Sequence, residues 1–133
     1  MKIGCTTTMY ESITTAEKRK MAGKYYGDYK GKIFKNIDKG IAIEFIGDGM
    51  RKISFGGRMY SKKLALLKCL PKIILNMRYN NFGKAKSTDK STVLGYLNFK
   101  ISVMIDEKKE NLRIAIQLRS NGKFYYNHDV NKV

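Results

Sequence analysis

The stretch that decides the fold is Val93-Leu94-Gly95-Tyr96-Leu97-Asn98-Phe99-Lys100-Ile101-Ser102-Val103-Met104-Ile105. Every odd-numbered residue in it except Gly95 is apolar, and from Leu112 to Leu118 every even-numbered residue is apolar. Because successive side chains of a strand point to opposite faces of a sheet, this alternation predicts two long strands with one buried face. Asn121-Gly122 is typical of a hairpin turn, so a third strand over 123–128 would complete an antiparallel meander.

The register of this meander follows from keeping apolar residues opposite one another, since a slip by one residue would move apolar side chains into water. A four-residue loop over 107–110 pairs Ile105 with Leu112 and Ile101 with Ile116. A two-residue turn at Asn121-Gly122 then pairs Leu118 with Tyr125. On the opposite face, this register predicts one row of three residues, Lys100, Gln117 and Tyr126, with Arg113, Arg119 and His128 nearby.

The residues before the meander predict helices and short strands. We expect Thr14 or Thr15 to cap a helix over 16–26, followed by strands at 32–35, 41–46 and 52–55. Ser61 is expected to cap a leucine-rich helix, and Pro71 to mark the first turn of a second helix, because proline lacks the N–H that a helix interior uses. Residues 83–91 are expected to form an exposed lysine-rich loop.

These elements predict an α+β fold in one domain over residues 1–133, with residues 1–12 a loose lead-in. An N-terminal helix and short strands come first, then two central helices. A C-terminal antiparallel meander of three to four strands follows, with the helices packed on one of its faces.

The strongest compositional signal is charge, because 27 Lys and Arg stand against 11 Asp and Glu, for a net charge of +16. Residues 51–92 alone hold eleven basic residues and one acid, Asp89. Polyphosphates bind such surfaces by releasing counterions, whatever their sequence. We therefore expect a nucleic acid or a ribonucleoprotein as the partner. Charge does not separate RNA from DNA, and RNA is expected ahead of DNA because the chemistry considered below acts on RNA. An acidic protein partner is the weaker alternative.

Several function classes find little support in the sequence. No apolar run reaches the roughly 20 residues that span a membrane, and the first ten residues lack the pattern of a secretory signal, so we expect a cytoplasmic protein of a bacterial host cell and no membrane partner. Cys5, Cys69 and His128 are too few and too scattered for a nitrogen- or sulfur-ligated metal site. We expect no metal and no cofactor.

The predicted open face of the meander suggests chemistry on RNA. A histidine or tyrosine beside fixed cations can move protons during metal-independent cleavage of a phosphodiester, while the cations stabilise the charge of the transition state. The candidate catalytic residues are His128, Tyr126, Arg119, Arg113 and Lys100. The candidate nucleic-acid-binding residues are Arg51, Lys52, Arg58, Lys62, Lys63, Lys84, Lys86, Lys90, Gln117 and Phe124.

Residues 61–130 resemble the nuclease-like domains of phage and mobile-element polyvalent proteins, of the barnase–EndoU–colicin–RelE fold group. The resemblance rests on a leucine-rich helix, the run Leu70-Pro71-Lys72-Ile73-Ile74, a lysine-rich loop, the strand around Phe99, the hairpin through Ile114, and Gly122-Lys123-Phe124-Tyr125-Tyr126-Asn127-His128. It implies helices packed on an antiparallel sheet whose open face cleaves RNA without metal, as many toxins of that group do.

The same resemblance leaves two functions open. Such domains often carry a histidine near the helix before the sheet, where this chain has Tyr60, Ser61 and Lys62. Either the catalytic residues are placed differently, or a binding surface is kept without activity. The second case fits a non-enzymatic inhibitor of a host defence ribonucleoprotein, similar to an anti-CRISPR protein, which would bind its RNA or DNA channel.

Overall fold

The computed structural model describes residues 3–46, 60–87 and 89–132, with Tyr60 and residues 127–132 described by their backbone. The predicted strand at 52–55 and the candidate residues Arg51, Lys52 and Arg58 lie outside the described residues. In chain order the elements are β1 Gly4–Cys5, α1 Thr8–Glu11, α2 Thr15–Tyr29, β2 Ile33–Asn36, β3 Ile41–Phe45, α4 Tyr60–Asn76, β4 Arg78–Lys84, β5 Val93–Ile105, β6 Lys108–Arg119 and β7 Phe124–Lys132.

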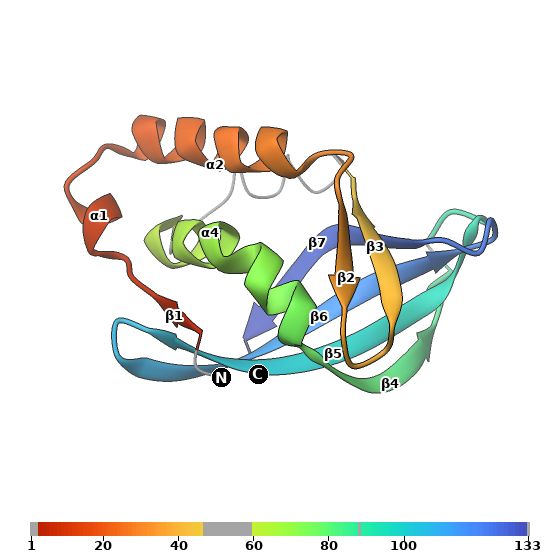
Figure 1. The fold of residues 1–133 in the computed structure, drawn as a ribbon. Helices are drawn as coiled ribbons and strands as arrows, with labels where there is room; N and C mark the ends of the chain where they lie inside the picture. Colours follow the sequence, from red (N-terminus) through yellow and green to blue (C-terminus); the bar gives the residue numbers. More distant parts are fainter. Residues whose placement is uncertain (1–2, 47–59, 88, 133) are drawn as a thin grey trace.

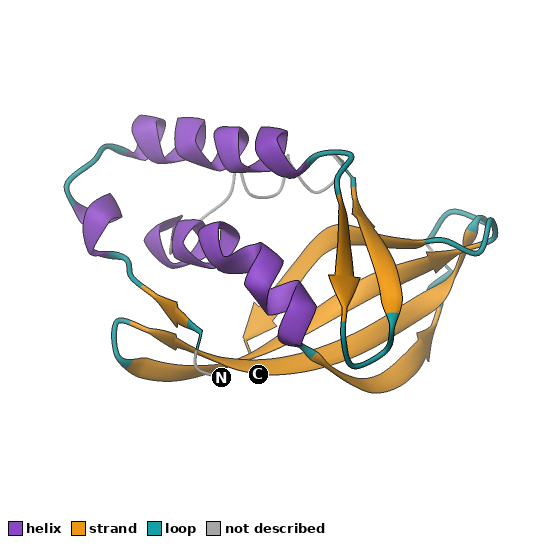
Figure 2. Ribbon diagram, in the orientation of Figure 1, coloured by secondary structure: helices purple, strands orange, loops and turns teal. Residues whose placement is uncertain are grey.

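The predicted α+β architecture is confirmed. The seven strands among the described residues form one sheet in the order β1-β5-β6-β7-β3-β2, with β4 paired to β5 beside this path. Figure 1 shows α4 between α2 and the concave side of the sheet, and Figure 2 shows both helices on that one side. The core fills this space with side chains from both layers, among them Leu64, Leu70, Phe99 and Ile114.

The register of β5 with β6 differs from the prediction by four residues, because the strands join through a tight turn at Asp106 and Glu107. Ile105 pairs with Lys108, and Phe99 pairs with Ile114. Both turn residues have positive φ, 49° and 67°, as a two-residue hairpin turn of type I′ requires. Four is an even number, so the same apolar side chains still face the core.

The register of β7 differs by one residue, and this odd shift exchanges its two faces. Leu118 pairs with Phe124, and Ile116 pairs with Tyr126. The turn is longer than predicted: the Arg119 N–H donates to the Lys123 carbonyl over 3.1 Å, and Gly122 has φ of 78°. Tyr126 therefore faces the core, where it is fully buried and stacks on Phe45 with ring centroids 4.9 Å apart.

The helix predicted over 16–26 is α2, which starts at Thr15 behind a Thr14 cap and ends three residues later than predicted. The Thr14 hydroxyl accepts a hydrogen bond from the Glu17 N–H over 3.1 Å, which satisfies one of the N–H groups that a helix start leaves free. Ala22 and Tyr26 are the buried residues of this helix. These two residues lie on the same side of α2, the side that packs against α4 and the core.

The central region is one continuous helix and not two, so the prediction of a break at Pro71 is wrong. Pro71 lies inside α4 and removes the N–H that would have bonded to the Leu67 carbonyl. The Tyr29 hydroxyl of α2 donates to that carbonyl instead, over 2.7 Å. A neighbouring helix thus replaces the missing donor, and the bond also ties α2 to α4.

The C-terminal end of α4 is held by the β2–β3 hairpin. The buried Asn36 side chain donates from Nδ2 to the carbonyls of Ile74 and Met77, over 2.7 and 2.9 Å. The Ile37 N–H donates to the Leu75 carbonyl over 3.0 Å. These bonds satisfy carbonyls that the end of a helix leaves without a partner inside the helix.

The first residues are not the loose lead-in that the sequence predicts. β1 pairs in parallel with the end of β5, and Ile3, Cys5 and Tyr10 are part of the core. The Asp106 carboxylate accepts hydrogen bonds from the backbone N–H and the hydroxyl of Thr7. The segment is thereby fixed to the β5–β6 turn. These bonds also hold the pKa of Asp106 below its usual value.

A second element missing from the prediction is β4, which the sequence assigned to the end of a helix and the start of a loop. It pairs with β5 antiparallel, and its register shifts between Tyr79 and Asn81. This irregularity interrupts the alternation that marks a strand in a sequence.

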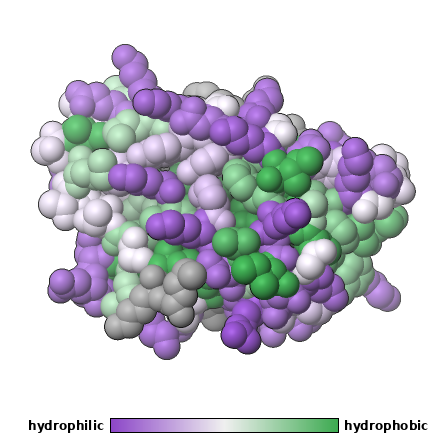
Figure 3. Space-filling model, viewed as in Figure 1, coloured by the Kyte–Doolittle hydropathy of each residue, from purple (hydrophilic) through white to green (hydrophobic). Residues whose placement is uncertain are grey.

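Among the described residues, no helix is long and apolar enough to cross a membrane. On the face of the molecule seen in Figure 3, hydrophilic side chains separate the hydrophobic areas from one another.

We predict that Tyr29→Phe lowers the free energy of unfolding by about 1–2 kcal/mol, because the Leu67 carbonyl loses its donor. In a Pro71→Ala background the same change should cost markedly less, since the new alanine would supply the missing N–H. Urea denaturation of the four proteins of this double-mutant cycle measures the coupling. Equal costs in both backgrounds would show that Tyr29 does not compensate for the proline.

Candidate functional site

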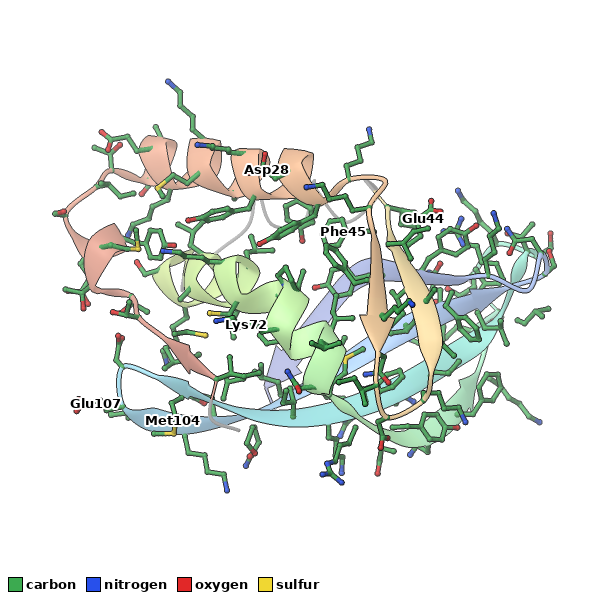
Figure 4. The ribbon with its side chains drawn as sticks, viewed as in Figure 1. Asp28, Glu44, Phe45, Lys72, Met104 and Glu107 are labelled. Atoms are coloured by element: carbon green, nitrogen blue, oxygen red, sulfur yellow. The ribbon has the colours of Figure 1, made fainter. Side chains whose placement is uncertain are left out.

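The side of the sheet opposite the helices offers a candidate site. We call the outward-pointing side chains of β4, β5 and β6 the open face. On β5 they are the even-numbered residues and on β6 the odd-numbered ones, as the burial along both strands shows. None of these strand residues is acidic. Figure 4 shows Met104 near one end of this face, close to Glu107 in the β5–β6 turn.

Three cations form a row across the middle of the open face. Arg78 of β4 pairs with Lys100 of β5, and Lys100 pairs with Arg113 of β6. Directly opposite residues have Cβ atoms about 4.5–5.5 Å apart, and like charges in such pairs are destabilising. All three side chains are exposed. Within the described part of the chain, none of them has an ion pair or a side-chain hydrogen bond.

Polar side chains flank the cation row on both sides. On one side the Asn98 amide donates to Oδ1 of Asn81 over 2.9 Å. On the other, the Ser102 hydroxyl donates to Oδ1 of Asn111 over 2.6 Å. A hollow of about 640 Å³ opens beside the row, and Asn76, Arg78, Lys100, Ser102 and Asn111 contribute to its lining. Cations and hydrogen-bonding groups thus lie side by side, the combination that binds a phosphate group through charge-assisted hydrogen bonds.

The far end of the open face carries an organised cluster of aromatic and polar side chains. Tyr96 pairs with Gln117, which pairs with Tyr125. The Arg119 guanidinium donates to Oε1 of Gln117 over 3.1 and 3.0 Å and lies 4.5 Å above the Tyr125 ring. Gln117 and Tyr125 are both buried by these contacts. In the next strand of the same row, Glu44 of β3 pairs with Tyr125.

The loop after β4 folds against this cluster. The Tyr96 hydroxyl donates to Oδ1 of Asp89 over 2.7 Å, and the Lys86 N–H donates to Oδ2 over 2.6 Å. The first of these bonds is the main reason that the pKa of Asp89 lies below its usual value. Lys86 and Lys90 are exposed on either side of the aspartate. The loop therefore adds positive charge beside the open face.

The candidate catalytic residues are only partly brought together. Lys100 and Arg113 are neighbours, closer than predicted, because the four-residue shift replaces Gln117 by Arg113 opposite Lys100. Arg119 lies at the other end of the face and is engaged by Gln117 and Tyr125. Tyr126 is in the core, so its predicted place on the open face is wrong. His128 lies in β7, where residues 127–129 form an irregularity opposite Ala115.

The candidate nucleic-acid-binding residues are dispersed. Lys62 lies in the first turn of α4, on the helix side of the sheet, where its Nζ lies 3.4 Å from the Glu110 carboxylate. Lys63 is also on α4, and Lys84 pairs with Gly95 near the edge of the sheet. Phe124 packs against the core from its margin, so the open face does not present its ring. Gln117 is on the open face but buried.

Sequence reasoning missed Arg78 and the role of Tyr96. Arg78 follows a helix without an intervening loop signal, and the irregularity of β4 hides its strand pattern. Tyr96 falls on an outward position of the alternation, a signal that could have identified it. Among the described residues no group of three or more His, Cys, Asp or Glu side chains could hold a metal ion.

We predict that Tyr126→Ala lowers the free energy of unfolding by about 3–5 kcal/mol, because it removes a fully buried ring from the core. Tyr125→Ala should cost less, since its ring lies on the face without a helix above it. Thermal and urea denaturation of both variants would test the register of β7. The reverse order would support the register derived from the sequence.

Comparison with known proteins finds one family model that matches this chain. The model of the family "large polyvalent protein-associated domain 3" matches residues 14–126, from the cap of α2 to the first residues of β7. No curated protein and no solved structure matches the chain. The match covers well over half of the chain and agrees with the resemblance to polyvalent proteins of phages and mobile elements. The protein therefore belongs to the large polyvalent protein-associated domain 3 family.

Proposed function

We propose that this protein binds nucleic acid, RNA in preference to DNA, through the open face of its sheet. The observation that carries the proposal is the cross-strand row of Arg78, Lys100 and Arg113. Three adjacent cations without an acidic partner among the described residues repel one another, and a chain of phosphates is a ligand that would relieve this repulsion. The net charge of +16 supports the same partner.

The shape of the face favours a single strand. RNA-binding modules commonly lay single-stranded RNA across an open antiparallel sheet, with phosphates against cations and bases against aromatic side chains. Here the cation row lies four residues along β5 from Tyr96, a distance of roughly 13 Å at the usual rise of a strand. A strand of a few nucleotides would reach from the row to the Tyr96 end of the face.

The geometry favours binding over cleavage. Metal-independent cleavage needs a proton-transfer group within hydrogen-bonding reach of a phosphate held by cations. Tyr126 is excluded from this role by its burial, and Arg119 already donates to Gln117. Of the two predicted proton carriers, Tyr126 and His128, His128 is the one that is left. A binding surface without cleavage corresponds to the inhibitor of a host ribonucleoprotein that the sequence leaves open.

We predict that replacing Arg78, Lys100 and Arg113 together by glutamine weakens the binding of single-stranded RNA by about two orders of magnitude at low salt. Each phosphate contact contributes about 0.7 to the slope of log K against log salt, so the slope should fall by about 2. Fluorescence anisotropy with a labelled oligonucleotide at several salt concentrations measures both quantities. Single-stranded DNA of the same sequence should bind more weakly.

The matched control replaces Arg19, Lys20 and Lys24 of α2, which are exposed on the helix side, by glutamine. It removes the same charge from the other side of the molecule and should change the affinity little. If both triple variants lose the same affinity, binding follows total charge and not the open face. If the wild type shows no salt dependence, the partner is not a polyphosphate.

We predict that purified protein leaves total RNA intact in the presence of EDTA, and that His128→Ala binds RNA as the wild type does. Gel analysis of the RNA after incubation provides the measurement. Discrete fragments that disappear in the His128→Ala variant would instead establish a metal-independent ribonuclease. In that case induction of the protein should also arrest bacterial growth.

A further inference from the structure

We propose that Cys5 and Cys69 form a thiol–disulfide exchange site, in which Cys69 attacks a low-molecular-weight disulfide and Cys5 resolves the adduct. The two residues are far apart in the sequence. Cys5 ends β1 and Cys69 lies in the middle of α4. The fold brings the two residues together where α4 packs on β1, on the helix side of the sheet and away from the open face. The site is thus independent of the proposed binding of nucleic acid.

Hydrogen bonds fix both cysteines in position. The Sγ of Cys69 lies 3.6 Å from the carbonyl oxygen of Gly4, the residue before Cys5, so its thiol lies against β1 beside Cys5. The Met104 N–H donates to the Ile3 carbonyl and the Asp106 N–H to the Cys5 carbonyl, over 2.9 and 3.0 Å. Because β1 is held in place, the second thiol meets the first at a high effective concentration.

The two thiols have different surroundings, which assigns their roles. Cys5 is buried, whereas Cys69 is half-buried. The hydrogen bond from Cys5 lowers the pKa of Cys69 to about 7, and Lys72 and Lys68 contribute in the same direction. The same hydrogen bond, together with burial, raises the pKa of Cys5. Cys69 is therefore the one of the two thiols that ionises near neutral pH, and thiolates are the attacking species.

The charged and titratable groups around Cys69 come from four elements. Lys68 and Lys72 flank it on α4, and Figure 4 labels Lys72 on this helix. Cys5 faces it from β1. Tyr10 of α1 and Tyr29 of α2 complete the surroundings, and their own pKa values are raised mainly by burial. Both tyrosines are neutral near pH 7, so the two lysines set the local charge.

The reaction balances with oxidised glutathione as the oxidant. The Cys69 thiolate attacks one sulfur of the glutathione disulfide, a Cys69–glutathione bond forms, and one glutathione thiolate leaves. The Cys5 thiol then gives up its proton and attacks Sγ of Cys69, and the second glutathione leaves with that proton. Counted from its two thiols, the protein loses two protons and two electrons, and one glutathione disulfide becomes two glutathione molecules.

The test is intact-mass analysis of the full chain during incubation with oxidised glutathione. The wild type should pass through a transient adduct to a product lighter by two hydrogens and free of glutathione. Cys5→Ala and Cys5→Ser should accumulate the adduct, so at least one of these variants reports even if the other folds poorly. Cys69→Ser should form neither product. Its circular dichroism should match that of the wild type.

Two further measurements separate this site from two ordinary thiols. The rate of alkylation of Cys69 should rise with pH through a midpoint near 7, and Lys72→Met should move this midpoint upward. A wild type that ends as a stable adduct overturns the proposal. So does a Cys69→Ser variant that reacts as fast as the wild type, or a midpoint at the ordinary value for cysteine.

Discussion

The pairing of β5 with β6 is the constraint on which the rest of the structure depends. Two long strands in this register place apolar residues on one face and polar residues on the other over their whole length. The apolar face has to be covered, and α4 covers it with Leu64, Leu67 and Leu70. The other face has no comparable reason to be covered, which leaves it available to carry Lys100 and Arg113 as exposed cations.

A set of carbonyl groups in α4 and directly after its end then determines how the remaining elements pack. Pro71 leaves the Leu67 carbonyl without a helical donor, and the end of the helix leaves those of Ile74, Leu75 and Met77. Tyr29 of α2 and the β2–β3 hairpin supply the missing donors. The helix that covers the sheet is therefore also the frame on which α2 and the hairpin are fixed. Each of these hydrogen bonds fixes the position of α2 or the hairpin along α4, which hydrophobic burial alone does not specify.

The parts of the fold that the sequence predicts are those that depend on periodicity. The buried faces of β5 and β6 are correct although their register was wrong, because a shift by four residues preserves the faces, and Lys100 and Arg113 remain on the open face. A shift by one residue in β7 moved Tyr126 into the core, since the turn around Gly122 is longer than two residues. The break predicted at Pro71 was wrong because the donor that compensates for the proline, Tyr29, is distant in sequence. The strand β4 was missed because it is irregular and its partner strand is distant in sequence. Arg78 was missed for the same reason.

The proposed function and the stability of the fold are linked through the cation row. Arg78, Lys100 and Arg113 occupy directly opposite positions, so their mutual repulsion is present whenever β4, β5 and β6 are paired. In the unfolded chain the three charges are separated and hydrated, and the repulsion acts on the folded state alone. A bound phosphate chain would reverse its sign, because each cation then faces an anion in place of a like charge. Part of the binding energy of such a site would come from removing this repulsion, because the pairing of the strands keeps the three cations from moving apart.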